Sequence, residues 1–321
     1  MKKKIRIGTR GSKLALWQAN FRSKLALWQA NFIKSEIKSL FPDCDVELNI
    51  IKTTGDRITD QPLAMIGGKG LFVKEIETAL LNNDIDLAVH SMKDMPGELP
   101  EGLVIGAIPK RENPFDVLIS RDKTLLTEYK KGAKIGTSSL RRASQIKHVR
   151  PDVTIESIRG NLDTRIKKLK SGEYDAIVLA AAGLIRLGQK NEITEYLDET
   201  IMLPAVGQGA LCIETRENDG DIAFIMEKLD HLDTRICVTG ERAFLKQIEG
   251  SCHIPVACFG KIKGNKVVLT AVVASVDGTK LIKEQIISPI DKVERQGQRL
   301  ADQVLEKGGK KILESLDSND A

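Results

Sequence analysis

Four loops of the sequence combine glycine, hydroxyl and basic residues at points where a strand gives way to a helix. A helix N-terminus carries unpaired N–H groups and a partial positive charge, so it attracts anions. Arginine forks and hydroxyl groups add donors that suit a carboxylate or a phosphate. Ordinary helix capping explains any one such loop, but four of them on two matched domains favour an anion-binding site. The loops are Thr9-Arg10-Gly11-Ser12, Gly67-Gly68-Lys69-Gly70, Gly136 to Arg142 and Arg159 to Arg165.

The glycine-rich loop at Lys69 is not a Walker A motif, because its spacing differs and neither Ser nor Thr follows the lysine. ATP binding is therefore not expected.

Charged residues also follow the buried strand expected at Ile85 to His90. Open α/β sheets place ligands at the ends of such strands. Asp94 is suited to act as a general acid or base or to stabilise a cation, and Lys93 is suited to bind an anion. A loop salt bridge explains the same two residues, and position alone does not decide between these interpretations.

Cys252 lies in a tight loop between Gly250 and Pro255. An exposed, ionisable cysteine in such a loop can be a nucleophile or an attachment site. Most cysteines are buried and inert, and composition alone favours that interpretation.

Length and composition restrict the class of protein. The chain has 321 residues, of which 41% are hydrophobic, which predicts two or three folded domains. No apolar run approaches the roughly 20 residues that cross a bilayer, and the basic start lacks the apolar stretch of an export signal. Five cysteines without a CxxC pair and four dispersed histidines indicate neither a disulfide framework nor a metal site. We therefore expect a cytoplasmic protein beginning near Met1, and its net charge of +5 suggests an anionic ligand.

Strand-length apolar segments alternate with helical patterns, which is typical of α/β sheets covered by helices. Ile7-Gly8-Thr9 and Ile135-Gly136-Thr137 open similar turns in the two halves. We expect two similar α/β domains, like those of periplasmic binding proteins, with a ligand in the cleft between them; chance similarity of two common turns is the alternative. The β-forming segment Val267 to Ser275 and the amphipathic segment Val293 to Leu305 predict a small C-terminal α+β domain.

A ten-residue segment occurs twice without change, at Ser12 to Phe21 and at Ser23 to Phe32. The repeat unit of eleven residues turns a helix by about 1100°, within roughly 20° of whole turns. The second copy can therefore continue a helix begun by the first, with its apolar face nearly in register.

These segments together resemble the porphobilinogen deaminase (hydroxymethylbilane synthase) family from about Ile5 to Leu313. Several long motifs in the right order make the resemblance more specific than a lone glycine pattern. The matching stretches are Leu14-Ala15-Leu16-Trp17-Gln18, Gly67 to Phe72, His90-Ser91-Met92-Lys93-Asp94, Gly136 to Arg142, Arg159-Gly160-Asn161, Leu203 to Gly209 and the loop at Cys252.

The resemblance implies a monomeric cytoplasmic transferase of haem and tetrapyrrole biosynthesis. Such enzymes join four porphobilinogen units head to tail, release ammonia at each step and free linear hydroxymethylbilane. A dipyrromethane cofactor would be attached through a thioether to Cys252. The implied domains are 1–109 with a return segment at 210–226, then 110–209, then 227–321. No metal, nucleic acid or membrane partner is implied.

The resemblance also assigns roles to residues. Asp94 matches the family's catalytic aspartate, which would contact pyrrole N–H groups and stabilise the cation that forms as ammonia leaves. Every pyrrole unit carries an acetate and a propionate, so many donors are needed. The residues implied in binding cofactor and substrate are Arg10, Ser12, Lys69, Ser91, Lys93, Thr137, Ser138, Ser139, Arg141, Arg142, Arg159, Arg165 and Arg186.

The sequence departs from the family pattern in three places. Met65 replaces a frequent lysine, Ser251 replaces a glycine and would strain a positive φ, and the repeat is inserted at the first helix. We expect the insertion to impair activity or stability, above all if it moves Arg10. An inactive or impaired deaminase is therefore one alternative. The other is an anion-binding solute protein without chemistry, and a nucleic-acid binder is a distant third.

Overall fold

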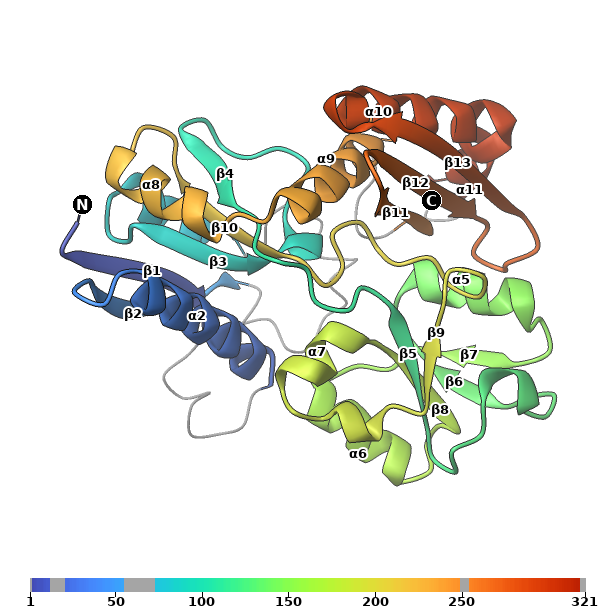
Figure 1. Ribbon diagram of the computed structural model, residues 1–321. Coiled ribbons are helices and arrows are strands. Elements are labelled where there is room, and N and C mark those ends of the chain that lie inside the picture. The colour runs from blue at the N-terminus through green and yellow to red at the C-terminus, as the bar shows by residue number, and fades with distance from the viewer. Residues whose placement is uncertain (1, 12–20, 55–72, 249–253, 318–321) are drawn as a thin grey trace. The chain divides into compact units, whose positions relative to one another are not determined.

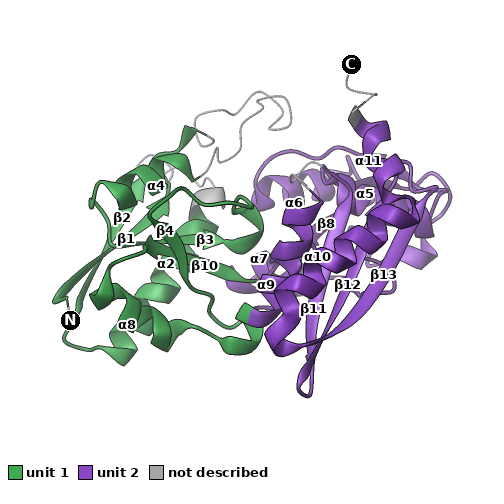
Figure 2. Cartoon of the chain, turned by 90° about the horizontal axis from the view of Figure 1, so that it is seen from above, with its two compact units in different colours: residues 1–111, 210–235 green, residues 112–209, 236–321 purple. Residues whose placement is uncertain are grey.

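The computed structural model describes residues 2–11, 21–54, 73–248 and 254–317 (Figure 1). Two compact units divide the chain (Figure 2). Unit 1 contains residues 1–111 and 210–235, and unit 2 contains residues 112–209 and 236–321. No helix in these described residues is long and apolar enough to span a membrane.

Unit 1 is built on a mixed five-stranded sheet of order β2-β1-β3-β10-β4. The strand β1 pairs in parallel with both β2 and β3, whereas β10 is antiparallel to β3 and β4. The sheet therefore takes one of its strands from the segment that returns after residue 209. Its strands are β1 (Lys4–Arg10), β2 (Asp45–Ile51), β3 (Leu87–Ser91), β4 (Leu103–Ala107) and β10 (Leu211–Arg216).

Two apolar layers cover this sheet, because successive side chains of a strand point to opposite faces. Leu87 and Val89 of β3 pack with α2 (Phe21–Leu40) and α8 (Gly220–Leu229). Ala88, between them, packs on the other face with α4 (Lys74–Leu81).

The second copy of the repeat lies within α2. Its Ala26 and Ala30, with the following Ile33 and Ile37, form a buried stripe on this helix. If the first copy took this place, Arg22 would stand where Ile33 is fully buried and Ala26 where Ile37 is. Burying an unpaired guanidinium costs several kcal/mol, and truncating a buried isoleucine to alanine costs about 2–5 kcal/mol. The residues after the two copies therefore select the second.

The end of β1 remains in register beside the insertion. Arg10 stands opposite Ile51 of β2, and the N–H of Gly11 donates to the Ile51 carbonyl at 3.0 Å. The insertion therefore does not displace Arg10 from the sheet edge.

Unit 2 contains a second five-stranded sheet of order β7-β6-β8-β5-β9, with the same arrangement of parallel and antiparallel pairs. The expected similarity of the two α/β sheets is thus confirmed. The strands are β5 (Asp116–Ser120), β6 (Lys134–Gly136), β7 (Thr154–Glu156), β8 (Ala176–Ala180) and β9 (Glu195–Leu197). The helices are α5 (Leu140–Val149), α6 (Leu162–Lys170) and α7 (Ala181–Arg186), with short turns η2 (Leu126–Glu128) and η3 (Lys190–Glu192).

Unit 2 also holds an antiparallel three-stranded sheet, β11-β12-β13, which is the expected C-terminal α+β element (Figure 1). Phe244 of α9 and Leu300 of α10 pack against Leu269 of β12 in its core. The elements are α9 (Leu232–Gln247), which begins in unit 1, β11 (Val256–Lys263), β12 (Lys266–Ala274), β13 (Leu281–Pro289), η4 (Ile290–Lys292), α10 (Val293–Val304), the π-turn η5 (Leu305–Gly309) and α11 (Lys310–Asp317).

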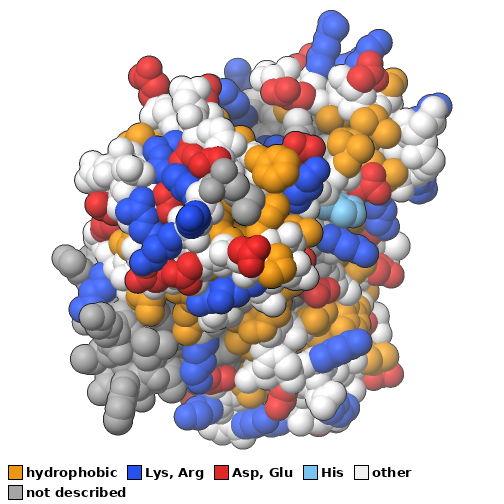
Figure 3. Space-filling view, turned by 60° about the vertical axis from the view of Figure 1, so that its left-hand side comes forward, with side chains coloured by type: hydrophobic (Ala, Val, Ile, Leu, Met, Phe, Trp, Pro, Cys, Tyr) orange, Lys and Arg blue, Asp and Glu red, His pale blue; other side chains and the backbone are white. Residues whose placement is uncertain are grey.

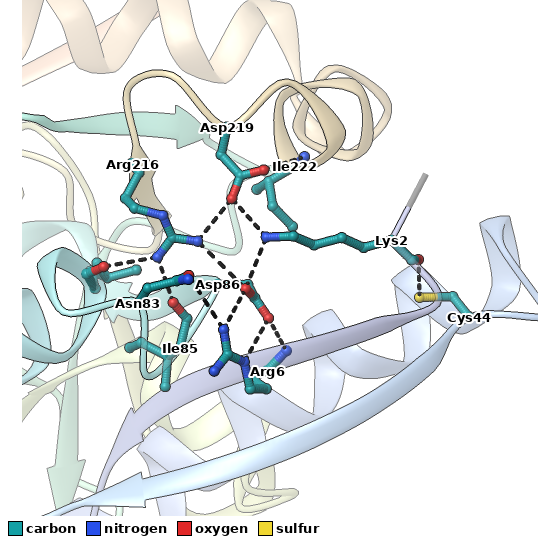
Figure 4. Close-up of polar contacts among 10 residues, drawn as sticks. Lys2, Arg6, Cys44, Asn83, Ile85, Asp86, Arg216, Asp219 and Ile222 are labelled. Atoms are coloured by element: carbon teal, nitrogen blue, oxygen red, sulfur yellow. Dashed lines mark hydrogen bonds and ion pairs between the residues drawn. The ribbon is translucent and has the colours of Figure 1, made fainter.

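A network of ion pairs joins distant segments of unit 1 at the amino end of β3 (Figure 4). The Asp86 carboxylate accepts from Lys2 at 3.0 Å and from Arg6 at 2.8 to 3.1 Å. Arg216 and Lys2 both donate to Asp219 at 2.8 Å. Burial alone would raise the pKa of Asp86, but the bonds from Arg6 and Lys2 outweigh it and lower that pKa to about 2.

This network predicts a pH-dependent contribution to stability. The pKa of Asp86 is lower in the folded state than its ordinary value of 3.8, so the contribution is complete above about pH 4 and is lost as pH falls towards 2. We expect Asp86→Asn to lower the free energy of unfolding at pH 7 by about 2 kcal/mol and to flatten its dependence on pH between 4 and 2. Urea unfolding followed by circular dichroism at several pH values measures both effects.

Asp84→Asn is the control, because Asp84 is an exposed carboxylate of the same turn. Unchanged stability and an unchanged acid slope in Asp86→Asn would contradict this role.

Candidate functional site

In unit 1, the candidate residues gather where β1 and β3 end. The two strands are parallel neighbours, so their carboxyl ends share one edge of the sheet. Arg10 is the last residue of β1 and Ser91 the last of β3. The Ser91 hydroxyl is bonded to the side-chain amide of Gln29 on α2.

The turn η1 (Met92–Asp94) carries the two charged candidates beyond β3. The N–H of Met92 donates to the Ala210 carbonyl at 3.0 Å, and the side chains of Met92 and Met95 are buried. Between these apolar anchors, Lys93 is half-buried and Asp94 is exposed. The turn thus holds a carboxylate and an ammonium group at the strand end, with Asp94 open to solvent.

A buried group of titratable side chains lies behind this edge, and sequence reasoning missed it. His90 Nε2 is 3.0 Å from Glu214 Oε2, and both side chains are buried. Glu77 of α4 is also buried; burial and the nearby Glu214 raise its pKa, while His90 opposes the shift. The only signal in the sequence was a titratable residue at an inward-facing position of β3, of β10 and of α4. The antiparallel register of β3 and β10 brings two of them together.

In unit 2, the hydroxyl candidates line the turn between β6 and α5. Thr137 is buried, and its N–H donates to the Glu156 carbonyl at 2.9 Å. Ser138 is exposed, and its hydroxyl donates to the Ile158 carbonyl at 2.7 Å. Ser139 is the N-cap residue of α5, but its side chain makes no capping bond. The turn therefore offers hydroxyl groups beside the N-terminus of a ten-residue helix, as an anion site requires.

Arg141 and Arg142 are turned inward to a buried carboxylate. Arg141 Nη1 donates to Asp116 at 2.7 Å, and Arg142 Nε donates to it at 2.8 Å. Arg141 also donates to the Leu203 carbonyl, and Arg142 to the Val178 carbonyl. Burial would raise the pKa of Asp116, but the two guanidinium groups and Gln208 lower it to about 2. Both arginines thus hold the protein interior together in this structure.

Arg159 and Arg165 are placed differently, around the N-terminus of α6. Arg159 is exposed, and Arg165 is half-buried with its Nε donating to the Gly160 carbonyl at 3.0 Å. Asn161 caps the helix by accepting from the Thr164 N–H at 2.7 Å. Gly160 has a φ of 109°, a conformation that only glycine adopts easily. These arginines stand at the surface where a ligand can reach them.

Arg186 ends α7, and its Nη2 donates to the Gly209 carbonyl at 2.7 Å. Burial lowers its pKa to about 10, against the opposing effect of Glu112. A guanidinium whose charge is disfavoured by burial gains from an anionic neighbour.

The carboxyl ends of β6, β7 and β8 share one edge, because these strands are parallel. Thr137 follows β6, Arg159 follows β7, and Arg186 follows β8 and α7. A hydroxyl and two guanidinium groups thus follow strands that end at this edge, which suits a ligand with carboxylate groups. Ser12, Lys69 and Cys252, like the departures Met65 and Ser251, lie outside the described residues.

Among the described residues, no group of three or more His, Cys, Asp or Glu side chains is placed to hold a metal ion. On the face drawn in Figure 3, basic and acidic side chains are interspersed.

Comparison with known proteins identifies one family over most of the chain. The family model described as "Porphobilinogen deaminase, dipyromethane cofactor binding domain" matches residues 21–223. The model described as "Porphobilinogen deaminase, C-terminal domain" matches residues 235–306.

Relatives of full length carry the same description. The porphobilinogen deaminase of Desulforamulus reducens is 46% identical over 316 residues, covering 98% of this chain and 99% of the relative. That of Geobacter sulfurreducens is 49% identical over 310 residues, covering 97% and 94%. Among solved structures, an extracellular amino-acid-binding protein of Bacillus subtilis is 13% identical with a TM-score of 0.39, covering 71% of this chain and 90% of its own.

The arginines of unit 2 separate into two testable classes. Arg142→Gln removes one of the two guanidinium groups that pair with buried Asp116, together with the donor to the Val178 carbonyl. We therefore expect the free energy of unfolding to fall by about 3 kcal/mol. Arg159→Gln removes an exposed side chain, and we expect a change within about 0.5 kcal/mol. Urea unfolding of the two variants measures the difference, and equal losses would show that this division is wrong.

Proposed function

The chain belongs to the porphobilinogen deaminase family, and from this premise we propose how its residues carry out that family's reaction. It acts as a transferase of tetrapyrrole biosynthesis that joins four porphobilinogen units and releases ammonia at each step. The observation that supports this best is the exposed Asp94 carboxylate, held at the end of β3 by buried Met92 and Met95.

The chemistry of the donor set in unit 2 fits a dipyrromethane cofactor, whose pyrroles carry carboxylates. Arg159, Arg165 and Arg186 are suited to pair with them. Ser139 is suited to donate a hydroxyl hydrogen bond, and Ser138 can do so when its hydroxyl turns from the Ile158 carbonyl. We propose Cys252 as the attachment residue and Lys69 and Ser12 as further donors, on the family resemblance. When bound, the cofactor supplies the pyrrole carbon to which the first substrate unit is joined.

Arg141 and Arg142 act indirectly in this proposal. Their pairing with Asp116 fixes the first turn of α5, and with it the position of Ser139. Thr137 acts in the same way, because its buried side chain accepts from the Ser139 N–H at 3.2 Å. Substrate carboxylates are bound by the exposed groups that these residues position.

In unit 1, Arg10, Ser91 and Lys93 bind substrate carboxylates beside Asp94. The Asp94 carboxylate accepts from the pyrrole N–H and faces the positive charge that develops on the substrate as the C–N bond breaks and ammonia leaves. A fixed anion aimed at developing positive charge lowers the barrier electrostatically. The neighbouring Lys93 keeps the local charge balanced while the substrate carboxylates bind.

Three wider features belong to the same proposal. The chain works as a cytoplasmic monomer, and porphobilinogen is its small-molecule substrate. Its functional domains are 1–109 with 210–226, then 110–209, then 227–321. This division follows the three sheets, two of which lie in unit 2.

Asp94→Ala tests the catalytic proposal. We expect turnover of porphobilinogen to fall at least 10²- to 10³-fold, because the anion facing the developing charge is lost. The fold should persist, since Asp94 is exposed. Ammonia release and hydroxymethylbilane formation measure turnover, and thermal unfolding measures the fold.

The control is Asp84→Ala, an exposed aspartate just before the other end of the same strand. Near-normal turnover in Asp94→Ala would refute the assigned role.

A further inference from the structure

The two identical decapeptides each contain a glutamine, Gln18 and Gln29. The sequence around them is the same from Ser to Phe, so the decapeptides themselves do not distinguish the two. The structure places Gln29 in α2, and α2 is also where the cofactor-domain family match begins, at residue 21.

Gln29 is a polar residue on the buried face of α2. It is 3% exposed and lies among Ala26, Ala30 and Ile33. The small Ala26 lets the helix approach the sheet, where the Thr9 hydroxyl donates to the Ala26 carbonyl at 3.2 Å. A buried side-chain amide destabilises the fold unless it is hydrogen-bonded, so Gln29 requires a partner at this position.

That partner is the Ser91 hydroxyl, which Gln29 contacts through both atoms of its amide. Gln29 Nε2 donates to Ser91 Oγ at 3.0 Å, and Ser91 Oγ is 3.4 Å from Gln29 Oε1, to which it donates. The shorter bond from Nε2 fixes the position of the Ser91 oxygen. The single hydroxyl hydrogen takes part only in the longer contact with Oε1, from which it can turn to a substrate carboxylate. Ser91 ends β3 and directly precedes the turn that carries Asp94.

We propose that Gln29, supplied by the second copy, is a positioning residue for the deaminase reaction. Its Nε2 holds the Ser91 oxygen in place near Asp94, and the Ser91 hydroxyl turns from Gln29 Oε1 to donate to a substrate carboxylate. The inference rests on the proposed function. It assigns the glutamine's contribution to the second copy, because Gln29 already fills the position beside Ser91.

The repeat itself provides a matched pair of variants. Gln29→Leu and Gln18→Leu make the same change in the same ten-residue context. We expect Gln29→Leu to raise the KM for porphobilinogen roughly five- to tenfold, as loss of an oriented hydrogen bond does. Gln18→Leu should leave kcat and KM within about twofold of the wild type.

A double-mutant cycle with Ser91→Ala separates positioning from a general structural effect. If Gln29 acts through Ser91, Gln29→Leu adds little in the Ser91→Ala background. Gln29→Met replaces Gln29→Leu if the latter does not fold, and the melting temperature of each variant shows whether it has.

Equal effects of the two glutamine variants, a normal KM in Gln29→Leu, or additive effects in the cycle would each overturn the proposal. Failure of the wild-type chain to consume porphobilinogen would instead refute the proposed function, and the inference with it.

Discussion

The pairing of the buried Asp116 carboxylate with two arginines is the interaction on which the proposed binding edge of unit 2 depends. The carboxylate accepts hydrogen bonds from Arg141, Arg142 and Gln208 in an interior that water does not reach. The two arginines lie in the first turn of α5, so this pairing decides where the helix begins and where Ser138 and Ser139 stand. Removing one member leaves the others charged and buried, so the cluster is retained or lost as a unit.

Buried ion pairs also stabilise unit 1, where they lie at one end of the strand β3 and the candidate site lies at the other. Asp86 precedes β3, and its ion pairs with Lys2 and Arg6 hold the amino end of the sheet. The strand itself is apolar on the α2 face, and its carboxyl end leads to Ser91 and Asp94. The ion pairs that stabilise the fold and the carboxylate proposed to serve the reaction thus lie at opposite ends of β3.

Much of this arrangement could be predicted from local pattern. An apolar segment of strand length predicted the buried strand β3, and the repeated Ile-Gly-Thr turn predicted two sheets of similar topology, which their corresponding strand arrangement confirms. The roles of the arginines could not be separated in this way, because Arg142 and Arg159 follow similar strand-to-helix turns. Only the position of Asp116 on a neighbouring strand distinguishes them.

The two glutamines pose the same difficulty in a stronger form, since their decapeptides are identical. The two copies differ in the residue that follows the decapeptide, which is Arg22 after the first copy and Ile33 after the second. Only Ile33 can be buried at that position of the helix at little cost. The pairing of His90 with Glu214 likewise depends on the register of β3 and β10, which no local pattern contains.

The central claim is that this chain builds and holds its own dipyrromethane group for the polymerisation of porphobilinogen. The most direct test is the intact mass of the purified chain under denaturing conditions, before and after incubation with porphobilinogen. The account predicts a mass above that of the sequence by two linked pyrrole units, which is lost in Cys252→Ser. A mass equal to that of the bare sequence, unchanged by porphobilinogen or by preformed hydroxymethylbilane, would contradict it.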